Sequence, residues 1–210
     1  MPHIEALRQH LQRLAALTAV FAVDLGEPQF VFHPGWRKNQ QVAMNINGCG
    51  DELYTHFVRA GCFIKGFAHE SEMTPYKRPD HSVWPGVLDR VPPEFNSSMK
   101  EPAFDPQATT FAIWRLASDS AWCTGVVEFP PGGYKDGSAD LLRPITFTPT
   151  EFTEWLAVNY ETDVDGDIVR SVFDGQPLSD QQMLALNPSS PIHALRSAVR
   201  DTGYPIQSGG

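Results

Sequence analysis

The order of hydrophobic and polar positions predicts a helix at the start of the chain, followed by several short strands. Apolar residues recur every three or four positions from Ile4 to Leu17, with Arg, Gln and His between them, which is typical of an amphipathic helix. Short apolar or alternating runs after it predict strands over residues 29–33, 41–46, 62–67, 109–116, 121–129 and 144–147. Pro34-Gly35 is expected to stop the first strand, which pairs with the second as a hairpin.

A glycine-rich loop, Asn47–Asp51, follows the second of these strands. It lacks the Lys-Ser/Thr ending of a phosphate-binding P-loop, so its glycines are interpreted as a tight turn. The apolar residues after Asp51 recur at helical spacing and predict a helix that ends near Gly61. They are Leu53, Tyr54, Phe57 and Val58.

Helical signals dominate the chain after residue 147. Thr148-Pro149-Thr150-Glu151 is a capping box with proline at the first helical position, and Ser179–Gln182 is a second capping box. Ser190-Pro191 predicts the start of another helix, and Ile168–Phe173 has the pattern of a short one. We therefore expect a C-terminal region built of helices.

Together these elements favour an α+β fold: a mainly antiparallel central sheet flanked by an N-terminal helix and a C-terminal helical region. We expect a single domain over residues 1–210, with 148–210 as an optional helical subdomain. Seven prolines between residues 75 and 106 leave room for little more than a short helix near Pro93. Trp84 and Phe95 are expected to anchor this segment as an ordered cover.

Composition indicates a globular protein in a reducing compartment. Of 210 residues, 41% are hydrophobic and 20% are charged, which suits a chain with a packed core. No apolar run approaches the roughly 20 residues that cross a bilayer, and the N-terminus lacks the features of a secretory signal. Cys49, Cys62 and Cys123 form no CxxC pair. We expect a cytoplasmic protein that does not associate with membranes.

The net charge of −9 is concentrated toward the C-terminus. From Thr148 onward there are nine acidic and three basic residues, an excess that disfavours a nucleic-acid partner and is compatible with a basic protein partner. The candidate partner-binding residues are Glu154, Glu161, Asp163, Asp165 and Asp167. An acidic surface that serves only solubility is the alternative. The spacing of Asp163–Ile168 does not match a calcium-binding EF-hand loop, so these acids are interpreted as a helix cap.

Candidate chemistry gathers around the sequence Gly66–Glu72 and the later pair Asp80-His81. His69, Glu70, Asp80 and His81 offer nitrogen and oxygen ligands for a divalent metal, although the spacing is not that of the HExxH metalloproteases. His69, Glu70 and His81 could instead serve as catalytic acid and base groups near neutral pH. A third interpretation is structural: Glu70 or Ser71 would bond backbone groups of the proline-rich loop. The residues alone leave these three open.

The sequence from Gly61 to Met73, with the later Trp84-Pro85-Gly86 and Ser120-Ala121-Trp122, carries a resemblance. Its Gly-Phe-x-His-Glu-Ser core resembles that of a family of uncharacterised bacterial cytoplasmic proteins, a likeness that spans roughly residues 60 to 125. This resemblance implies no activity, cofactor or catalytic residue. In composition and architecture the chain is also similar to immunity proteins of bacterial toxin systems.

Two classes of function follow. The first is an immunity-like, non-catalytic binding protein, whose acidic C-terminal face meets a basic protein partner and which needs no cofactor. The second is a metal-dependent or acid/base hydrolase that uses His69, Glu70 and His81. The first requires the five carboxylates to be exposed together, and the second requires the three side chains to converge.

Overall fold

The computed structural model describes residues 1–26, 28–131 and 135–207. The chain forms an α+β fold whose contacts divide it into two compact units. The sheet unit comprises residues 1–4 and 35–143, and the helical unit comprises residues 5–34 and 144–210. The helical unit thus combines the expected subdomain 148–210 with an N-terminal segment. The single domain stays a prediction.

The N-terminal helix is present as α1, Ile4–Ala22, and its leucines Leu7, Leu11, Leu14 and Leu17 are buried as the pattern predicts. Strand β1, Phe30–Arg37, continues through Pro34-Gly35, so the expected stop there is wrong. Because β1 is the first strand in the sheet order, it is an edge strand, where a proline with no N–H to donate is tolerated.

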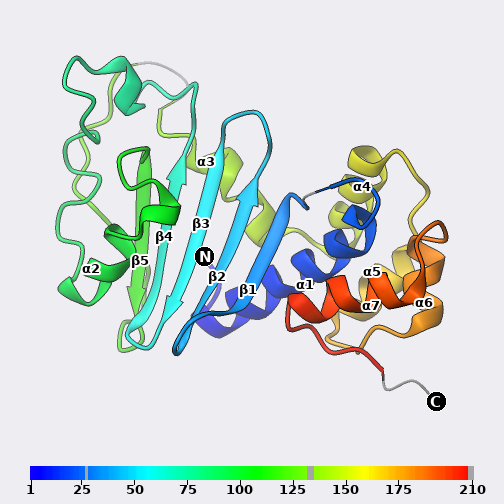
Figure 1. Ribbon diagram of the computed structural model, residues 1–210. Coiled ribbons are helices and arrows are strands. Elements are labelled where there is room, and N and C mark those ends of the chain that lie inside the picture. The colour runs from blue at the N-terminus through cyan, green and yellow to red at the C-terminus, as the bar shows by residue number, and fades with distance from the viewer. Residues whose placement is uncertain (27, 132–134, 208–210) are drawn as a thin grey trace. The chain divides into compact units, whose positions relative to one another are not determined.

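The sheet has the order β1-β2-β3-β4-β5-β6, and neighbouring strands are consecutive in the chain. After β1 come β2 (Gln40–Ile46), β3 (Glu52–Val58), β4 (Gly61–Phe67), β5 (Phe111–Leu116) and β6 (Cys123–Thr124). Strands β2 to β6 pair antiparallel, and Figure 1 shows β2 to β5 side by side. The strand predicted over 121–129 is reduced to the two residues of β6.

The expected helix after Asp51 is wrong, because Glu52–Val58 is strand β3. This strand lies between β2 and β4, and its residues from Leu53 to Phe57 are all buried. A strand covered on both faces carries apolar residues without alternation, so its sequence imitates the spacing of a buried helix. The strand prediction over 144–147 is also wrong: Arg143–Thr146 is a short 3-10 helix, η4.

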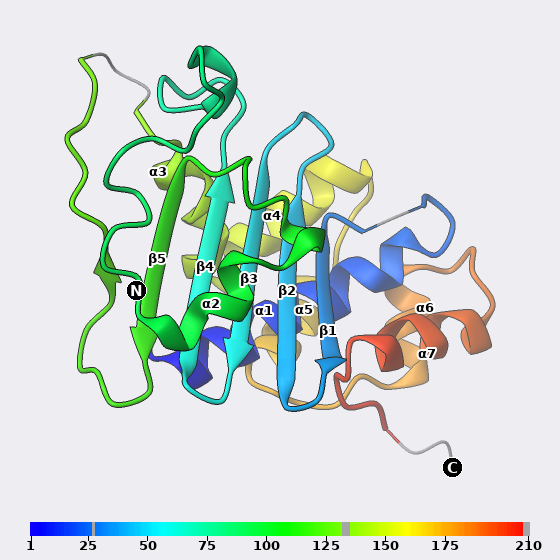
Figure 2. The ribbon, with the colours of Figure 1, turned by 60° about the vertical axis from the view of Figure 1, so that its left-hand side comes forward.

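The segment between β4 and β5 covers one face of the sheet unit. It contains η1 (Pro75–Lys77), η2 (Pro93–Phe95), α2 (Asn96–Met99) and η3 (Pro102–Phe104). The Phe95 ring is fully buried with its centroid 5.8 Å from that of Phe63 in β4. The Trp84 indole donates to the Glu128 carbonyl at 3.0 Å. Figure 2 shows α2 crossing in front of the central strands. Both predicted anchors therefore hold the segment.

A short helix, α3 (Ser138–Leu141), closes the sheet unit, and four helices form the C-terminal part of the helical unit. They are α4 (Pro149–Tyr160), α5 (Gly166–Phe173), α6 (Asp180–Leu186) and α7 (Ile192–Asp201). Both capping boxes are formed as predicted, by Thr148 with Glu151 and by Ser179 with Gln182. Among the described residues, no helix is long and apolar enough to cross a membrane.

The core of the helical unit joins α1 and the start of β1 to these helices. The Phe152 ring lies 5.9 Å from the rings of Phe30 and Phe173, measured between centroids. The buried Thr18 hydroxyl donates to the Phe30 carbonyl at 3.0 Å, which ties α1 to β1. The Asn187 amide donates to the Val20 carbonyl at 2.9 Å. Residues far apart in sequence therefore share one core.

Candidate functional site

The loop between β2 and β3 is folded around the Asn47 side chain, whose oxygen accepts from the backbone N–H of Cys49 at 2.9 Å and of Asp51 at 3.1 Å. Gly48 and Gly50 have φ of +72° and +102°, a region that favours glycine, so the predicted tight turn is present. A Cβ on Gly50 would lie 3.3 Å from the His69 ring. This loop therefore sets Asp51 beside the end of β4.

Asp51 and His69 form a hydrogen-bonded pair at this end of the sheet. The Asp51 carboxylate accepts from the backbone N–H of His69 at 2.9 Å and from its ring Nδ1 at 2.7 Å. Partial burial raises the pKa of Asp51, but the hydrogen bonds from His69 and Asn47 outweigh it, so this pKa lies below its usual value. With Nδ1–H directed to the carboxylate, Nε2 is the ring nitrogen left for proton transfer.

Asp51 was absent from the predicted site. Register explains the pairing: Glu52 lies opposite Phe67, so the residues just outside the β3–β4 ladder, Asp51 and His69, come close together. The signal that could have found it was the hairpin itself, which was hidden because β3 resembles a helix in sequence.

The other predicted site residues are only partly brought together. The Glu70 carboxylate lies 3.8 Å from His69 Nε2. Asp80 accepts from the Ser82 hydroxyl at 2.8 Å and lies 3.3 Å from the Arg78 guanidinium, while the His81 ring lies 6.3 Å from the Tyr76 ring. Among the contacts of the described residues, none joins Asp80 or His81 to His69.

No three His, Cys, Asp or Glu side chains in the described part of the chain are arranged to hold a metal ion. The metal set His69, Glu70, Asp80 and His81 therefore stays a prediction. Ser71 is fully buried, accepts from the Met73 N–H at 2.9 Å and donates to the Lys135 carbonyl, so its role is structural. Both partners lie outside the proline-rich loop, and the predicted bonds to that loop stay a prediction.

The five predicted partner-binding carboxylates are all exposed. Glu154 lies on α4, and Glu161 is the residue that ends this helix, in a left-handed conformation. Asp163, Asp165 and Asp167 follow in the connection to α5, where the Asp165 carboxylate caps the helix by accepting from the Asp167 N–H at 2.9 Å. We call these five residues the acidic surface.

Cations of the helical unit leave the acidic surface uncompensated. Arg196 forms two hydrogen bonds with Asp180, at 2.6 and 2.8 Å. In the described residues, no ion pair involves a member of the acidic surface. By sequence, the helical unit holds 12 acidic and 5 basic residues, so it carries −7 of the net charge of −9.

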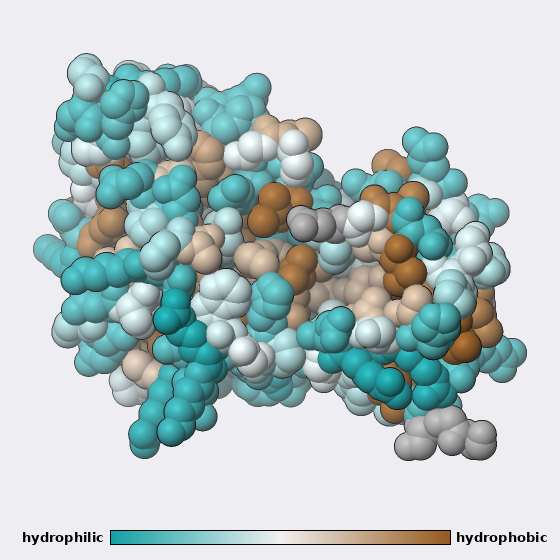
Figure 3. All heavy atoms as spheres, viewed as in Figure 1, coloured by the Kyte–Doolittle hydropathy of each residue, from teal (hydrophilic) through white to brown (hydrophobic). Residues whose placement is uncertain are grey.

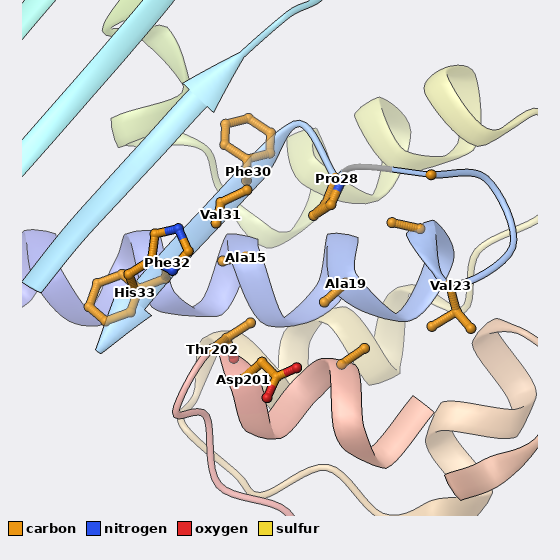
Figure 4. Close-up of a pocket in the computed structure, with 13 residues that line it drawn as sticks. Ala15, Ala19, Val23, Pro28, Phe30, Val31, Phe32, His33, Asp201 and Thr202 are labelled. Carbon is orange, nitrogen blue, oxygen red and sulfur yellow. The ribbon is translucent and has the colours of Figure 1, made fainter. Parts of the chain in front are cut away.

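A groove of about 270 Å³ lies in the helical unit between α1, the start of β1 and α7. Figure 4 shows Ala15 and Ala19 of α1, Val31 of β1 and Asp201 of α7 around it. In the space-filling view, tan and brown apolar residues gather in a hollow of this unit beside teal polar ones (Figure 3). Burial lowers the pKa of His33, which also lines the groove. We call this the α1–α7 groove.

A second cavity, of about 150 Å³, lies beside β5 in the sheet unit. Its polar wall is occupied by internal hydrogen bonds: the Thr110 hydroxyl donates to the Asp136 carbonyl at 2.7 Å, and the Ser138 hydroxyl donates to the Asp136 carboxylate at 2.8 Å. These groups hold the segment after β6 in place.

The sheet unit also buries two titratable side chains under η3. Lys65 is 3% exposed, and its ammonium donates to the Phe104 carbonyl at 2.5 Å. Burial lowers the pKa of Lys65 to about 8, although Glu52 and Asp105 raise it. Burial also lowers the pKa of His56 to about 4. Because both side chains are sealed from solvent, they act as structural groups.

Comparison of the chain with protein-family models, with curated proteins and with solved structures found no match. The resemblance of the Gly66–Ser71 core therefore stays a prediction, and a function has to be argued from the geometry.

Proposed function

We propose that this protein is a non-catalytic binding protein, similar in kind to immunity proteins, which presents its acidic surface to a basic protein partner. The observation that carries the proposal is the exposure of Glu154, Glu161, Asp163, Asp165 and Asp167 together on α4, its connection to α5 and the first turn of α5.

Electrostatics supports this use of the surface. Carboxylates that form no ion pair within the protein can attract a positively charged partner, which speeds the encounter and suppresses acidic competitors. The position of Asp165 and Asp167 at the N-terminus of α5 stabilises their negative charge through the helix dipole. Val158, which is 76% exposed and lies four residues after Glu154 on α4, adds an apolar contact beside it.

The test compares two variants with the same change in net charge. The surface variant carries Glu161→Gln, Asp163→Asn and Asp167→Asn, and keeps the capping residue Asp165. The matched control carries three substitutions of exposed acids in the sheet unit: Glu70→Gln, Asp89→Asn and Glu94→Gln.

Each tagged full chain is used to isolate partners from cells of its source, and the affinity of any stoichiometric basic protein is then measured at low and high salt. We expect at least a tenfold loss of affinity for the surface variant, a weaker salt dependence, and no comparable loss for the control. A basic partner that binds the surface variant as tightly as the wild type would contradict the proposal.

The Asp51–His69 pair favours a second candidate, acid/base hydrolysis with His69 as the proton acceptor, in place of the set His69, Glu70 and His81. An exposed imidazole oriented by a carboxylate is the arrangement that general-base catalysis uses. Hydrolysis of p-nitrophenyl acetate is measured for the wild type, His69→Gln and His81→Gln, with and without added zinc. The candidate expects a loss of about 100-fold or more for His69→Gln alone. A wild-type rate equal to that of buffer would exclude it for this substrate class.

A further inference from the structure

The α1–α7 groove exists because small side chains meet where two helices and a strand would otherwise fill the space. Ala15, Ala19 and Ala22 of α1 line it, and so does Ala198 of α7. Ala19 and Ala22 are almost fully buried, so the groove is a recess with a closed floor. An apolar recess of this kind gains free energy when an apolar group enters it and displaces water.

The groove is open to the surface in Figure 3 and has a volume of about 270 Å³. Sites that enclose small molecules usually measure about 300–1,000 Å³ and bury most of the ligand. A shallower recess of this size fits one large side chain with part of its neighbours. Protein interfaces use such pockets for the few anchor residues that carry most of the binding energy.

The chemistry at the end of the groove selects a positive charge. Asp201, the last residue of α7, is exposed and is the one carboxylate among the described residues that line the groove. His33, which also lines the groove, is held toward its neutral form because burial lowers its pKa. A cation on the incoming segment would therefore meet an acidic rim with no competing positive charge from this histidine.

Helix α1 also contacts α4, on a different face from the one that lines the groove. Tyr160, next to Glu161, stacks on Phe21 with 4.8 Å between ring centroids. The residues after Phe21, Ala22 and Val23, line the groove. α1 therefore packs against α4 and lines the groove with separate sets of residues in the same unit.

We propose that the α1–α7 groove binds a large apolar side chain from an extended segment of the basic partner, with an adjacent Lys or Arg placed at Asp201. This inference rests on the proposed function, since charge complementarity with the helical unit identifies the occupant as part of a basic protein.

The experiment selects random heptapeptides displayed on phage against the immobilised full chain. The groove variant is Ala198→Trp, which places an indole in the recess from a half-buried position, and its matched control is Ala185→Trp at an exposed position of α6. A second variant, Asp201→Asn, removes the charge and leaves the shape. Circular dichroism establishes that each variant is folded.

We expect the wild type and Ala185→Trp to enrich sequences in which a large apolar residue neighbours Lys or Arg, and Ala198→Trp to enrich none of them. Synthetic copies of the enriched peptides should bind Ala198→Trp at least thirtyfold more weakly and Asp201→Asn several-fold more weakly. Because Asp201→Asn keeps the recess intact, its effect supports the inference even if Ala198→Trp fails to fold.

Three outcomes would overturn the inference. If the enriched peptides are basic, lack an apolar anchor and bind Ala198→Trp as tightly as the wild type, the groove is not their binding site. The proposed function would still stand. Apolar peptides without cations, whose binding does not change with salt or with Asp201→Asn, would contradict the inferred basic occupant and leave the proposed function, which the surface variant tests, unaffected. If free hexylamine displaces the peptide and binds with the same affinity, the groove is a site for small amines and not for a protein segment.

Discussion

Replacement of Lys65 by methionine tests whether a buried charge limits the stability of the sheet unit. The ammonium lies under η3, donates to the Phe104 carbonyl at 2.5 Å and is 5.2 Å from the centroid of the Tyr54 ring. Methionine has a similar length and no charge, so Lys65→Met removes the desolvated charge and leaves that carbonyl without its donor.

The magnitude follows from proton linkage. The pKa of Lys65 is about 8 in the folded protein and 10.5 as its ordinary value. At pH 7 Lys65 is protonated in both the folded and the unfolded state. The difference between the two pKa values then corresponds to a cost of about 3 kcal/mol for folding with the charge. As pH rises through 8 the folded state releases its proton while the unfolded state keeps it, so stability increases. By pH 9.5 the cost falls to about 1.4 kcal/mol, a gain of about 2 kcal/mol.

In the variant this gain is absent. At pH 7, loss of the hydrogen bond to Phe104 costs about 1–3 kcal/mol and opposes relief of the buried charge, so the two proteins should have similar stability. The stability of the wild type relative to the variant should therefore be about 2 kcal/mol greater at pH 9.5 than at pH 7. Groups that titrate in both proteins cancel from the difference.

Urea unfolding followed by tryptophan fluorescence measures the stability difference between the wild type and Lys65→Met, because four of the five tryptophans lie in the sheet unit. Lys38→Met, at an exposed position of the same unit, is the control and should show a stability difference that does not depend on pH. The same wild-type-to-Lys65→Met difference at both pH values would refute the reasoning.

Two further predictions concern the same unit. His56, buried between the Ser98 hydroxyl and the Gln40 side-chain oxygen, has its pKa lowered from 6.5 to about 4. As pH falls, the unfolded state therefore takes up a proton before the folded state does. Between pH 7 and pH 4.5 the free energy of unfolding of the wild type should fall by about 2–3 kcal/mol more than that of His56→Gln. An equal loss of stability in the two proteins would contradict this. A Cβ on Gly66 would lie 2.1 Å from the Phe111 ring, so Gly66→Ala should cost about 1–3 kcal/mol in urea unfolding, and Phe111→Leu in the same chain should recover part of the loss.

Several elements were predictable from the sequence because their causes are local. The capping boxes at Thr148 and Ser179 consist of contacts three residues apart, so the helix starts follow from a few neighbouring letters. The same holds for the leucine face of α1 and for the cap at Asp165, where the spacing of side chains along one helix decides the outcome. The exposed acidic residues follow from charge, which favours contact with water.

Tertiary structure decided the rest. β3 resembles a helix in sequence because neighbours cover both of its faces, and only the sheet order reveals that cover. The pairing of Asp51 with His69, 18 residues away, depends on the register of β3 against β4. The α1–α7 groove forms where alanines on α1 and α7 meet β1. An alanine in a helix sequence does not indicate whether another element packs closely against it or leaves a groove there. Contacts within one helical turn depend on neighbouring residues, so the sequence predicts them. Strand register and grooves depend on how segments distant in sequence pack together.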